Sequence, residues 1–102
     1  MPNVVLVTGG FDPVHSGHIS YLKEARSLGY RLVVGLNSDE WLIRKKGTFF
    51  LPFEERAAVL GAIKYVNDVM PFNDDDGTSN DAIDKLLAVS YTHLTLPTSV
   101  TV

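Results

Sequence analysis

Short apolar runs alternate with segments of helical periodicity along the first 87 residues, and this alternation constrains the fold more than any other feature. Residues 4–7 and 31–37 are apolar enough to be strands buried on both faces. Residues 68–72 predict a third short strand, with Pro71 at its end or in an edge position. Because helical segments follow each of these runs, we expect an α/β fold with a parallel sheet, a Rossmann-like three-layer sandwich.

The helical segments have recognisable beginnings and ends. In the first, Ile19, Leu22, Ala25 and Leu28 form one apolar stripe, which predicts the buried face, and Gly29 stands at the expected stop. The other helices are expected over residues 41–45, capped by residues 38–40, over residues 52–65, and over residues 79–87.

Composition excludes several classes of protein. A chain of 102 residues supports one small domain, and its net charge of -3 argues against a nucleic-acid partner. No apolar run approaches the about 20 residues that span a bilayer, so we expect no membrane partner and a cytoplasmic location. The absence of cysteine agrees with that location and excludes a thiolate nucleophile. The acidic residues 74–76 predict a solvated turn, and the basic residues 44–46 suit a small anionic ligand.

The stretch GGFDPVHSGH, residues 9–18, lies where the first strand ends and the first helix begins. A glycine-rich turn before a helix presents unpaired backbone N–H groups and the positive end of the helix dipole, and both attract phosphate. His15 and His18 are three residues apart, so one helical turn can place both rings on the same side. The alternative is a capped turn with two surface histidines, but the position after a strand favours a phosphate site.

These residues resemble the nucleotidyltransferase superfamily marked by His-x-Gly-His, and within it the cytidylyltransferase-like family. Glycerol-3-phosphate cytidylyltransferases and the adenylyltransferases that make ADP-heptose belong to that family. The resemblance covers Gly-x-Phe-Asp-x-x-His-x-Gly-His at residues 9–18, Val-Gly-Leu-Asn-Ser-Asp-Glu at residues 34–40, Lys45, and Glu55-Arg56. Relatives often carry Thr or Ser where this chain has Gly10, so a hydroxyl that could donate to phosphate is missing, but a glycine still fits the turn.

The resemblance implies transfer of a nucleotidyl group from CTP or ATP, with Mg²⁺, to a phosphorylated small molecule such as glycerol 3-phosphate or a sugar 1-phosphate. It implies that His15, His18 and Lys45 are catalytic. The same comparison assigns nucleotide binding to Gly9, Gly10, Phe11, Asp12, His15 and His18, and acceptor binding to Lys45, Lys46 and Arg56. It gives Asp12 a role in orienting the loop or placing the metal, and no residue is assigned as a metal ligand.

For Arg56 a salt bridge on the helix is an equal alternative to contact with the acceptor phosphate, and Asp39 is interpreted as a helix cap. Relatives are commonly dimers, so a homodimer is an open expectation.

The end of the chain departs from this pattern. Residues 88–102 contain no Asp, Glu, Lys or Arg, and residues 90–98 resemble the translated read-through of a sequencing adapter. We therefore expect a nucleotidyltransferase domain at residues 1–87, C-terminally truncated, and a non-native tail at residues 88–102, with a genuine β-rich tail as the alternative. The family's second motif, an Arg before a Gly-Ile-Ser-Thr-type turn, is not found after residue 87.

Truncation has consequences for the first strand and for activity. The first strand should become an edge, which the tail could occupy, and this chain alone should be a poor enzyme. The competing hypotheses are a non-catalytic nucleotide-binding module and an inactive fragment of such an enzyme.

Overall fold

The computed structural model describes residues 4–78, 80–88 and 94–95. Strands and helices alternate in the predicted order. The elements are β1 (Val4–Gly9), α1 (Ser16–Ser27), β2 (Arg31–Leu36), α2 (Asp39–Lys46), α3 (Phe53–Gly61), β3 (Asp68–Pro71), α4 (Asn80–Ala88) and β4 (Leu94–Thr95).

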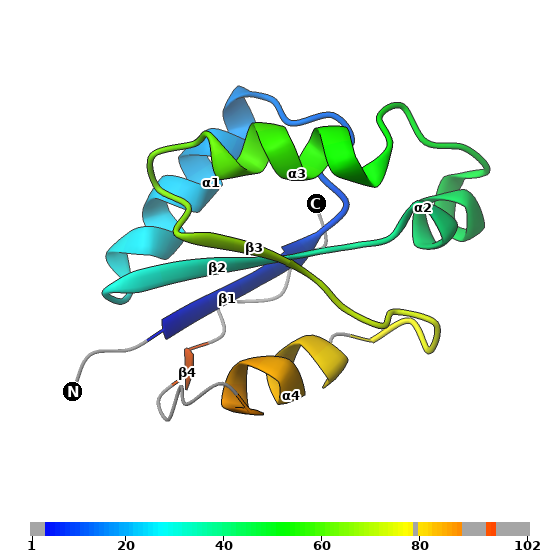
Figure 1. Cartoon of the computed structure of the whole chain (residues 1–102). Helices are drawn as coiled ribbons and strands as arrows, with labels where there is room; N and C mark the ends of the chain where they lie inside the picture. Colours follow the sequence, from blue (N-terminus) through cyan, green and yellow to red (C-terminus); the bar gives the residue numbers. More distant parts are fainter. Residues whose placement is uncertain (1–3, 79, 89–93, 96–102) are drawn as a thin grey trace.

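The strands form one parallel sheet in the order β3-β2-β1-β4. α1 and α3 lie over one face of this sheet and α4 lies over the other, so the three expected layers are present (Figure 1). The chain adds β2 and β3 on one side of β1 and β4 on the other side, so the strand order reverses at β1. Ligands of parallel sheets bind outside the carboxyl ends of strands at such a reversal. The segment that follows β1 is GGFDPVHSGH.

The two hydrophobic cores follow from the alternation of side chains along the strands. Val5 and Val7 of β1 join the core beneath α1 and α3, whereas Val4 and Leu6 join the core that α4 covers. The register pairs Val5 with Leu32, so β2 divides its side chains between the same two cores. Because both faces are covered, the central strands are apolar at almost every position.

The buried face of α1 differs from the predicted stripe. Leu22 and Ala25 are buried as expected, but Ile19 is 41% exposed and Leu28 is 52% exposed. His18 is buried in place of Ile19. Successive residues of a helix are turned by about 100° from each other, so burying His18 directs Ile19 toward solvent. The apolar periodicity could not show that the first position of the buried stripe is a histidine.

The other helices and the third strand agree with the sequence within a few residues, except for the end of α3. This helix ends at Gly61 and not near residue 65, because the chain then makes tight turns in which the Ile63 N–H donates to Leu60 O and the Val66 N–H to Ile63 O. β3 is an edge strand that ends at Pro71, as predicted.

β4 lies within the segment interpreted as a non-native tail. It places Leu94 and Thr95 beside Val4 and Val5, which is the edge that the tail was expected to occupy. The remainder of the tail, residues 89–93 and 96–102, lies outside the described residues, and the boundary at residue 87 stays a prediction. None of the helices described, α1 to α4, has the length and apolar content needed to cross a bilayer.

Candidate functional site

A pocket of about 280 Å³ opens where β1 ends. We call it the histidine pocket; its lining residues are Gly10, Phe11, Asp12, Pro13, His15, His18, Trp41, Leu42, Lys45 and Lys46. Eight of these belong to the motif or the basic cluster that the sequence singled out. The fold therefore brings the segment after β1 and the last turn of α2 to one place, as a parallel sheet with short connections requires.

His15 and His18 are held against each other at the beginning of α1. The two rings stack with their centroids 3.9 Å apart. Nδ1 of His15 accepts a hydrogen bond from the Gly17 N–H, and Nδ1 of His18 accepts one from the His15 N–H. An imidazole that accepts at Nδ1 carries its proton at Nε2. This assignment, made from the hydrogen bonds, gives the pocket two Nε2–H donors.

Burial keeps His18 neutral over a wider pH range than usual. Desolvation lowers the pKa of His18 below its ordinary value, and the neighbouring His15 imidazole lowers it further. The ring also meets Phe11 edge-on, with the centroids 5.2 Å apart. Phe11 is fully buried in the core beneath α1 and α3, has a φ of 49°, and also lines the histidine pocket. His18 is thus a rigid donor rather than a surface side chain.

Gly17 is required by the position of His15. A Cβ built on Gly17 would lie 2.9 Å from Cε1 and 3.1 Å from Nδ1 of His15. Any larger residue at this position would displace the His15 ring. The sequence suggested that Gly17 leaves room for a ligand, and the structure shows that it also leaves room for the catalytic candidate beside it.

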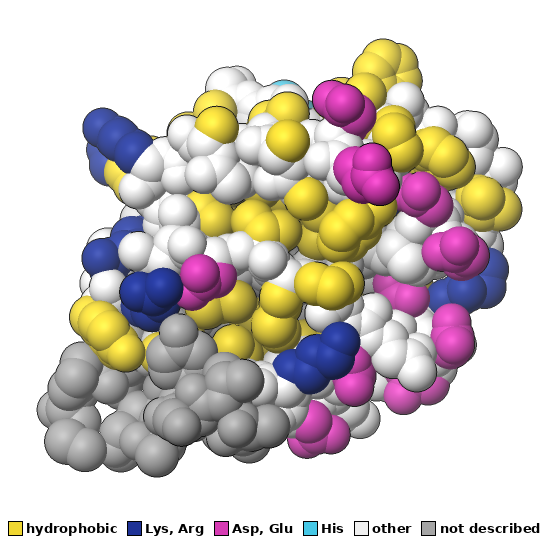
Figure 2. Space-filling view, viewed as in Figure 1, with side chains coloured by type: hydrophobic (Ala, Val, Ile, Leu, Met, Phe, Trp, Pro, Cys, Tyr) yellow, Lys and Arg dark blue, Asp and Glu magenta, His cyan; other side chains and the backbone are white. Residues whose placement is uncertain are grey.

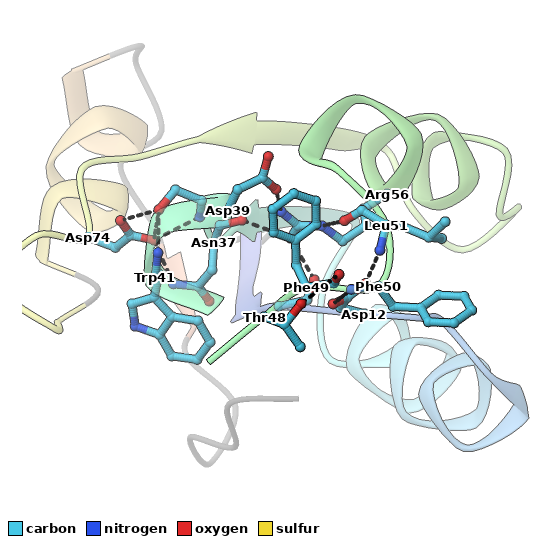
Figure 3. A network of polar contacts seen from close by, with 12 residues as sticks. Asp12, Asn37, Asp39, Trp41, Thr48, Phe49, Phe50, Leu51, Arg56 and Asp74 are labelled. Atoms are coloured by element: carbon cyan, nitrogen blue, oxygen red, sulfur yellow. Dashed lines mark hydrogen bonds and ion pairs between the residues drawn. The ribbon is translucent and has the colours of Figure 1, made fainter. Parts of the chain in front are cut away.

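Asp12 organises the loop between α2 and α3 (Figure 3). Its carboxylate accepts hydrogen bonds from the N–H groups of Phe50 and Leu51, both at 2.6 Å. Lys46 Nζ lies 3.1 Å from the same carboxylate and also donates to the Asp12 carbonyl. Burial alone would raise the pKa of Asp12, but these donors outweigh it and the pKa lies below its ordinary value. Of the two roles that the sequence left open for Asp12, the geometry supports loop orientation.

Arg56 lies beneath the pocket and not in its lining. Its guanidinium donates to the carbonyls of Gly10 and Asn37, both at 2.8 Å, which joins the segments after β1 and β2. Nη2 also pairs with Asp39 at 2.6 Å, and Nε donates to Leu51 O (Figure 3). The salt-bridge alternative for Arg56 is therefore present. The interpretation of Asp39 as a cap is wrong, because Ser38 is the N-cap of α2 and accepts the Trp41 N–H, whereas the Asp39 carboxylate pairs with Arg56. Contact between Arg56 and an acceptor phosphate stays a prediction, and it would require these bonds to break.

Asp74 corrects the expectation of a fully solvated acidic turn. It is 2% exposed, and its carboxylate accepts hydrogen bonds from the Asn37 side chain and from both the N–H and the hydroxyl of Ser38. Burial would raise the pKa of Asp74, but these donors lower it below its ordinary value. The sequence did contain a signal for this contact. Asn37 and Ser38 follow β2 and Asp74 follows the neighbouring strand β3, so the three residues lie at the same edge of the sheet.

Sequence reasoning also missed Trp41. Its ring lines the histidine pocket, and Lys45 Nζ lies 4.6 Å from the ring centroid. Residues four apart on a helix are neighbours, so the spacing of Trp41 and Lys45 could have shown this. Of the predicted site residues, Gly9 is the other one outside the lining: it lies within β1, where its carbonyl accepts the Asn37 N–H.

The described residues contain no group of three or more His, Cys, Asp or Glu that could hold a metal ion. Asp12 is the carboxylate in the lining of the histidine pocket, and it is engaged with Phe50, Leu51 and Lys46. Mg²⁺ in nucleotide sites is commonly held by one or two carboxylates together with substrate phosphates and water. A Mg²⁺ ion bound in this pocket would therefore have to take most of its ligands from the nucleotide phosphates and from water.

Comparison with known proteins gives one consistent result. A family model described as cytidylyltransferase-like matches residues 6–94. The proteins named bifunctional protein HldE from Yersinia pestis (strain Pestoides F) and from Yersinia pseudotuberculosis serotype O:1b (strain IP 31758) are each 49% identical to the chain over 74 residues. That alignment covers 71% of this chain but 16% of each relative, so the chain corresponds to a small part of those proteins.

A solved structure shares the fold. The lipopolysaccharide core biosynthesis protein from Thermoplasma volcanium GSS1 superimposes with a TM-score of 0.71, covering 98% of this chain and 99% of that one. Sequence identity in this comparison is 21%, so the likeness shows the fold alone.

Proposed function

Because the chain belongs to the cytidylyltransferase-like family, we propose that it contributes the triphosphate-binding half of a nucleotidyltransferase. The reaction is transfer of a nucleotidyl group from CTP or ATP to a phosphorylated small molecule, with release of pyrophosphate. The observation that carries the proposal is the stacked pair of His15 and His18 imidazoles, which both accept a backbone hydrogen bond at Nδ1 and line one pocket with Lys45.

The chemistry needs positioning and charge stabilisation more than it needs a nucleophile on the protein. An oxygen of the acceptor phosphate attacks the α-phosphorus and forms a new P–O bond. The bond from the α-phosphorus to the bridging oxygen breaks, and its electron pair leaves with pyrophosphate. Mg²⁺ supplies charge neutralisation on the triphosphate when it is bound.

The residues of this chain have separate roles in that scheme. His15 and His18 donate to the phosphate oxygens on which charge increases in the transition state. Lys45 neutralises phosphate charge, and it can leave the Trp41 ring to do so because both are in the same pocket. Lys46 and Asp12 hold the loop that borders the pocket. Gly9, Gly10 and Phe11 contribute their backbone to the site for the nucleotide phosphates. A cytoplasmic location and a homodimer are also part of this proposal.

The test measures pyrophosphate release with CTP and ATP against glycerol 3-phosphate and heptose 1-phosphate, together with nucleotide binding by calorimetry. Loss of one donor to the transition state lowers kcat by about 10²–10³, so His15→Ala and His18→Ala should each reduce turnover that far. Lys45→Ala should weaken nucleotide or acceptor binding, whereas Lys23→Ala, an exposed lysine on α1 outside the pocket, should not. Unchanged rates in both histidine variants would contradict the proposed roles.

The same measurements separate the competing functions. Nucleotide binding that depends on His15 and His18, without turnover for any acceptor, would favour the non-catalytic module or inactive fragment. Turnover at an ordinary rate by these 102 residues would contradict the expectation that the chain alone is a poor enzyme. Discrimination between CTP and ATP decides whether the activity is cytidylyl or adenylyl transfer.

A further inference from the structure

Asp74 is the buried residue of an otherwise exposed acidic turn. Asp75 and Asp76 beside it are exposed, and Figure 2 shows acidic side chains gathered on the side of the molecule where this turn and α2 lie. A carboxylate that is 2% exposed is costly to bury unless hydrogen bonds compensate for the lost water. The partners that compensate Asp74 come from the end of β2 and from both ends of α2.

At the beginning of α2, Asp74 acts through the cap of the helix. Its carboxylate accepts hydrogen bonds from the Ser38 N–H and from the Ser38 hydroxyl, both at 2.8 Å. A hydroxyl has one proton, so donation of that proton to Asp74 leaves the Ser38 lone pairs to accept the Trp41 N–H, which lies 3.0 Å away. Asp74 therefore orients the group that caps α2, and the Trp41 side chain lines the histidine pocket.

Arg44 joins the last turn of α2 to the same residue. Its Nη2 donates to the Asp74 carbonyl at 3.0 Å and lies 4.0 Å from the Asp74 carboxylate. Because successive helical residues are turned by about 100°, Arg44 lies about 60° outside an arc of about 140° that contains the pocket-lining residues of α2. These lining residues are Trp41, Leu42, Lys45 and Lys46. In Figure 3 Asp74 lies beyond Trp41 and Asn37, on the far side from Asp12.

The buried ion pair at the other side of α2 holds only the first turn of the helix. It joins Asp39 to Arg56, which in turn bonds to the Gly10 carbonyl. A helix held at one end can still change its direction, whereas contacts at both ends fix it. Since Lys45 directly follows Arg44, a change in the direction of α2 moves Lys45 relative to the first turn of α1, where both histidines of the pocket lie.

We propose that Asp74 is a positioning residue for the histidine pocket. By holding both ends of α2, it keeps Lys45 in the same cavity as His15 and His18, where the three side chains can bind one triphosphate. The inference rests on the proposed function, because it assigns a support to the same site. It also gives a role to a residue that lies outside the pocket lining and far from the motif in the sequence.

The test is calorimetric titration of the complete 102-residue chain with inorganic triphosphate, which carries no base and so does not depend on the choice between CTP and ATP. If charge alone mattered, removal of a carboxylate would strengthen binding of an anion, because like charges repel. Positioning predicts the opposite sign, so Asp74→Asn should weaken triphosphate binding about tenfold. Asp75→Asn removes the same charge from the exposed neighbouring residue and should not weaken binding. Unchanged or tighter binding by Asp74→Asn, or equal weakening by Asp75→Asn, would overturn the proposal.

A double-mutant cycle with Lys45→Ala separates positioning from a general loosening of the fold. Lys45→Ala alone should weaken triphosphate binding about tenfold, since a hydrogen bond from a charged donor is lost. If Asp74 acts through Lys45, adding Asp74→Asn to Lys45→Ala should cost less than about a further twofold. Losses that simply multiply would show that Asp74 does not act through Lys45, and the proposal would fail.

Ser38→Ala keeps the test decisive if Asp74→Asn does not fold. This variant removes the hydroxyl that joins Asp74 to the Trp41 N–H and leaves the charge of the chain unchanged. With a folded circular dichroism spectrum, it should weaken triphosphate binding by at least about twofold. Wild-type affinity in folded Ser38→Ala would refute the connection from Asp74 through the cap to the pocket.

The outcomes also separate this inference from the function on which it rests. If His15→Ala, His18→Ala and Lys45→Ala weaken triphosphate binding but Asp74→Asn does not, the function stands and the inference fails. If the wild-type chain does not bind triphosphate, or if both histidine variants bind it as tightly as the wild type, the proposed function fails and the inference fails with it.

Discussion

Replacement of Arg56 by methionine should be among the most destabilising single changes in this chain. Methionine keeps much of the side-chain length but removes the guanidinium, which is fully buried and makes four hydrogen bonds. The carbonyls of Gly10 and Asn37 would lose a buried donor, and Asp39 would lose its ion-pair partner. Arg56 thus holds together the ends of β1 and β2.

The magnitude follows from the kind of interaction that is broken. Removing one partner of a buried charge pair costs about 3–5 kcal/mol, because the other partner stays desolvated. We take this range rather than the sum of four hydrogen bonds, since Asp39 is 28% exposed and water can partly replace the guanidinium. Domains of this size have a free energy of unfolding of about 5–15 kcal/mol, so the loss is a large share of the total.

The assay is urea unfolding followed by circular dichroism and by the fluorescence of Trp41, the single tryptophan. The matched control is Lys85→Met, which breaks the Lys85–Asp81 pair, whose side chains are 48% and 35% exposed. Such a surface pair contributes about 0.3–0.5 kcal/mol. Arg56→Lys keeps the charge but not the planar fork, so its loss in free energy of unfolding should lie between those of Arg56→Met and Lys85→Met. This variant should remain folded, so that ligand binding can be measured. A loss below about 1 kcal/mol for Arg56→Met would refute the bracing role. Loss of acceptor binding in a fully stable Arg56→Lys would instead support direct contact with the acceptor.

The remaining predictions concern residues 9–18, the segment proposed to bind phosphate. Gly17→Ala should weaken phosphate binding in a calorimetric titration, because the new Cβ would lie 2.9 Å from Cε1 of His15. Gly61→Ala, whose Cβ would meet nothing within 4 Å, should leave binding unchanged and raise stability by about 0.4–1 kcal/mol. Because the pKa of His18 is lowered in the folded state, the unfolded state binds the proton more readily. The stabilising contribution of neutral His18 is therefore present above pH 6.5 and is lost as the pH falls from 6.5 through the lowered pKa. An NMR-titrated pKa of His18 at or above 6.5 would contradict this. For Asp12, whose pKa is also lowered, stability should fall as the pH drops from 3.8 through the lowered pKa, and Asp12→Asn should remove that part of the acid dependence measured by urea unfolding.

Much of the fold follows from local patterns in the sequence. The order of elements, the parallel sheet and the cap of α2 at Ser38 depend on periodicity and on capping residues, which act within a few positions. The stripe on α1 failed at Ile19 because the buried place went to His18, whose partners are Phe11 and the His15 backbone. His18 is buried because of these contacts, which a pattern of apolar residues does not include.

The sequence by itself determined the local arrangement of residues 4–18: a strand, a glycine-rich turn, and two histidines whose hydrogen bonds join residues two and three positions apart. The tertiary structure decided what supports that segment. Asp12 bonds to Leu51 across 39 positions, Arg56 to Gly10 across 46, and Asp74 to Ser38 across 36. Contacts within one helical turn are set by backbone geometry, so a sequence pattern displays them. Contacts across tens of residues exist only once the strand order places β1, β2 and β3 side by side, so that their carboxyl ends meet at one edge of the sheet.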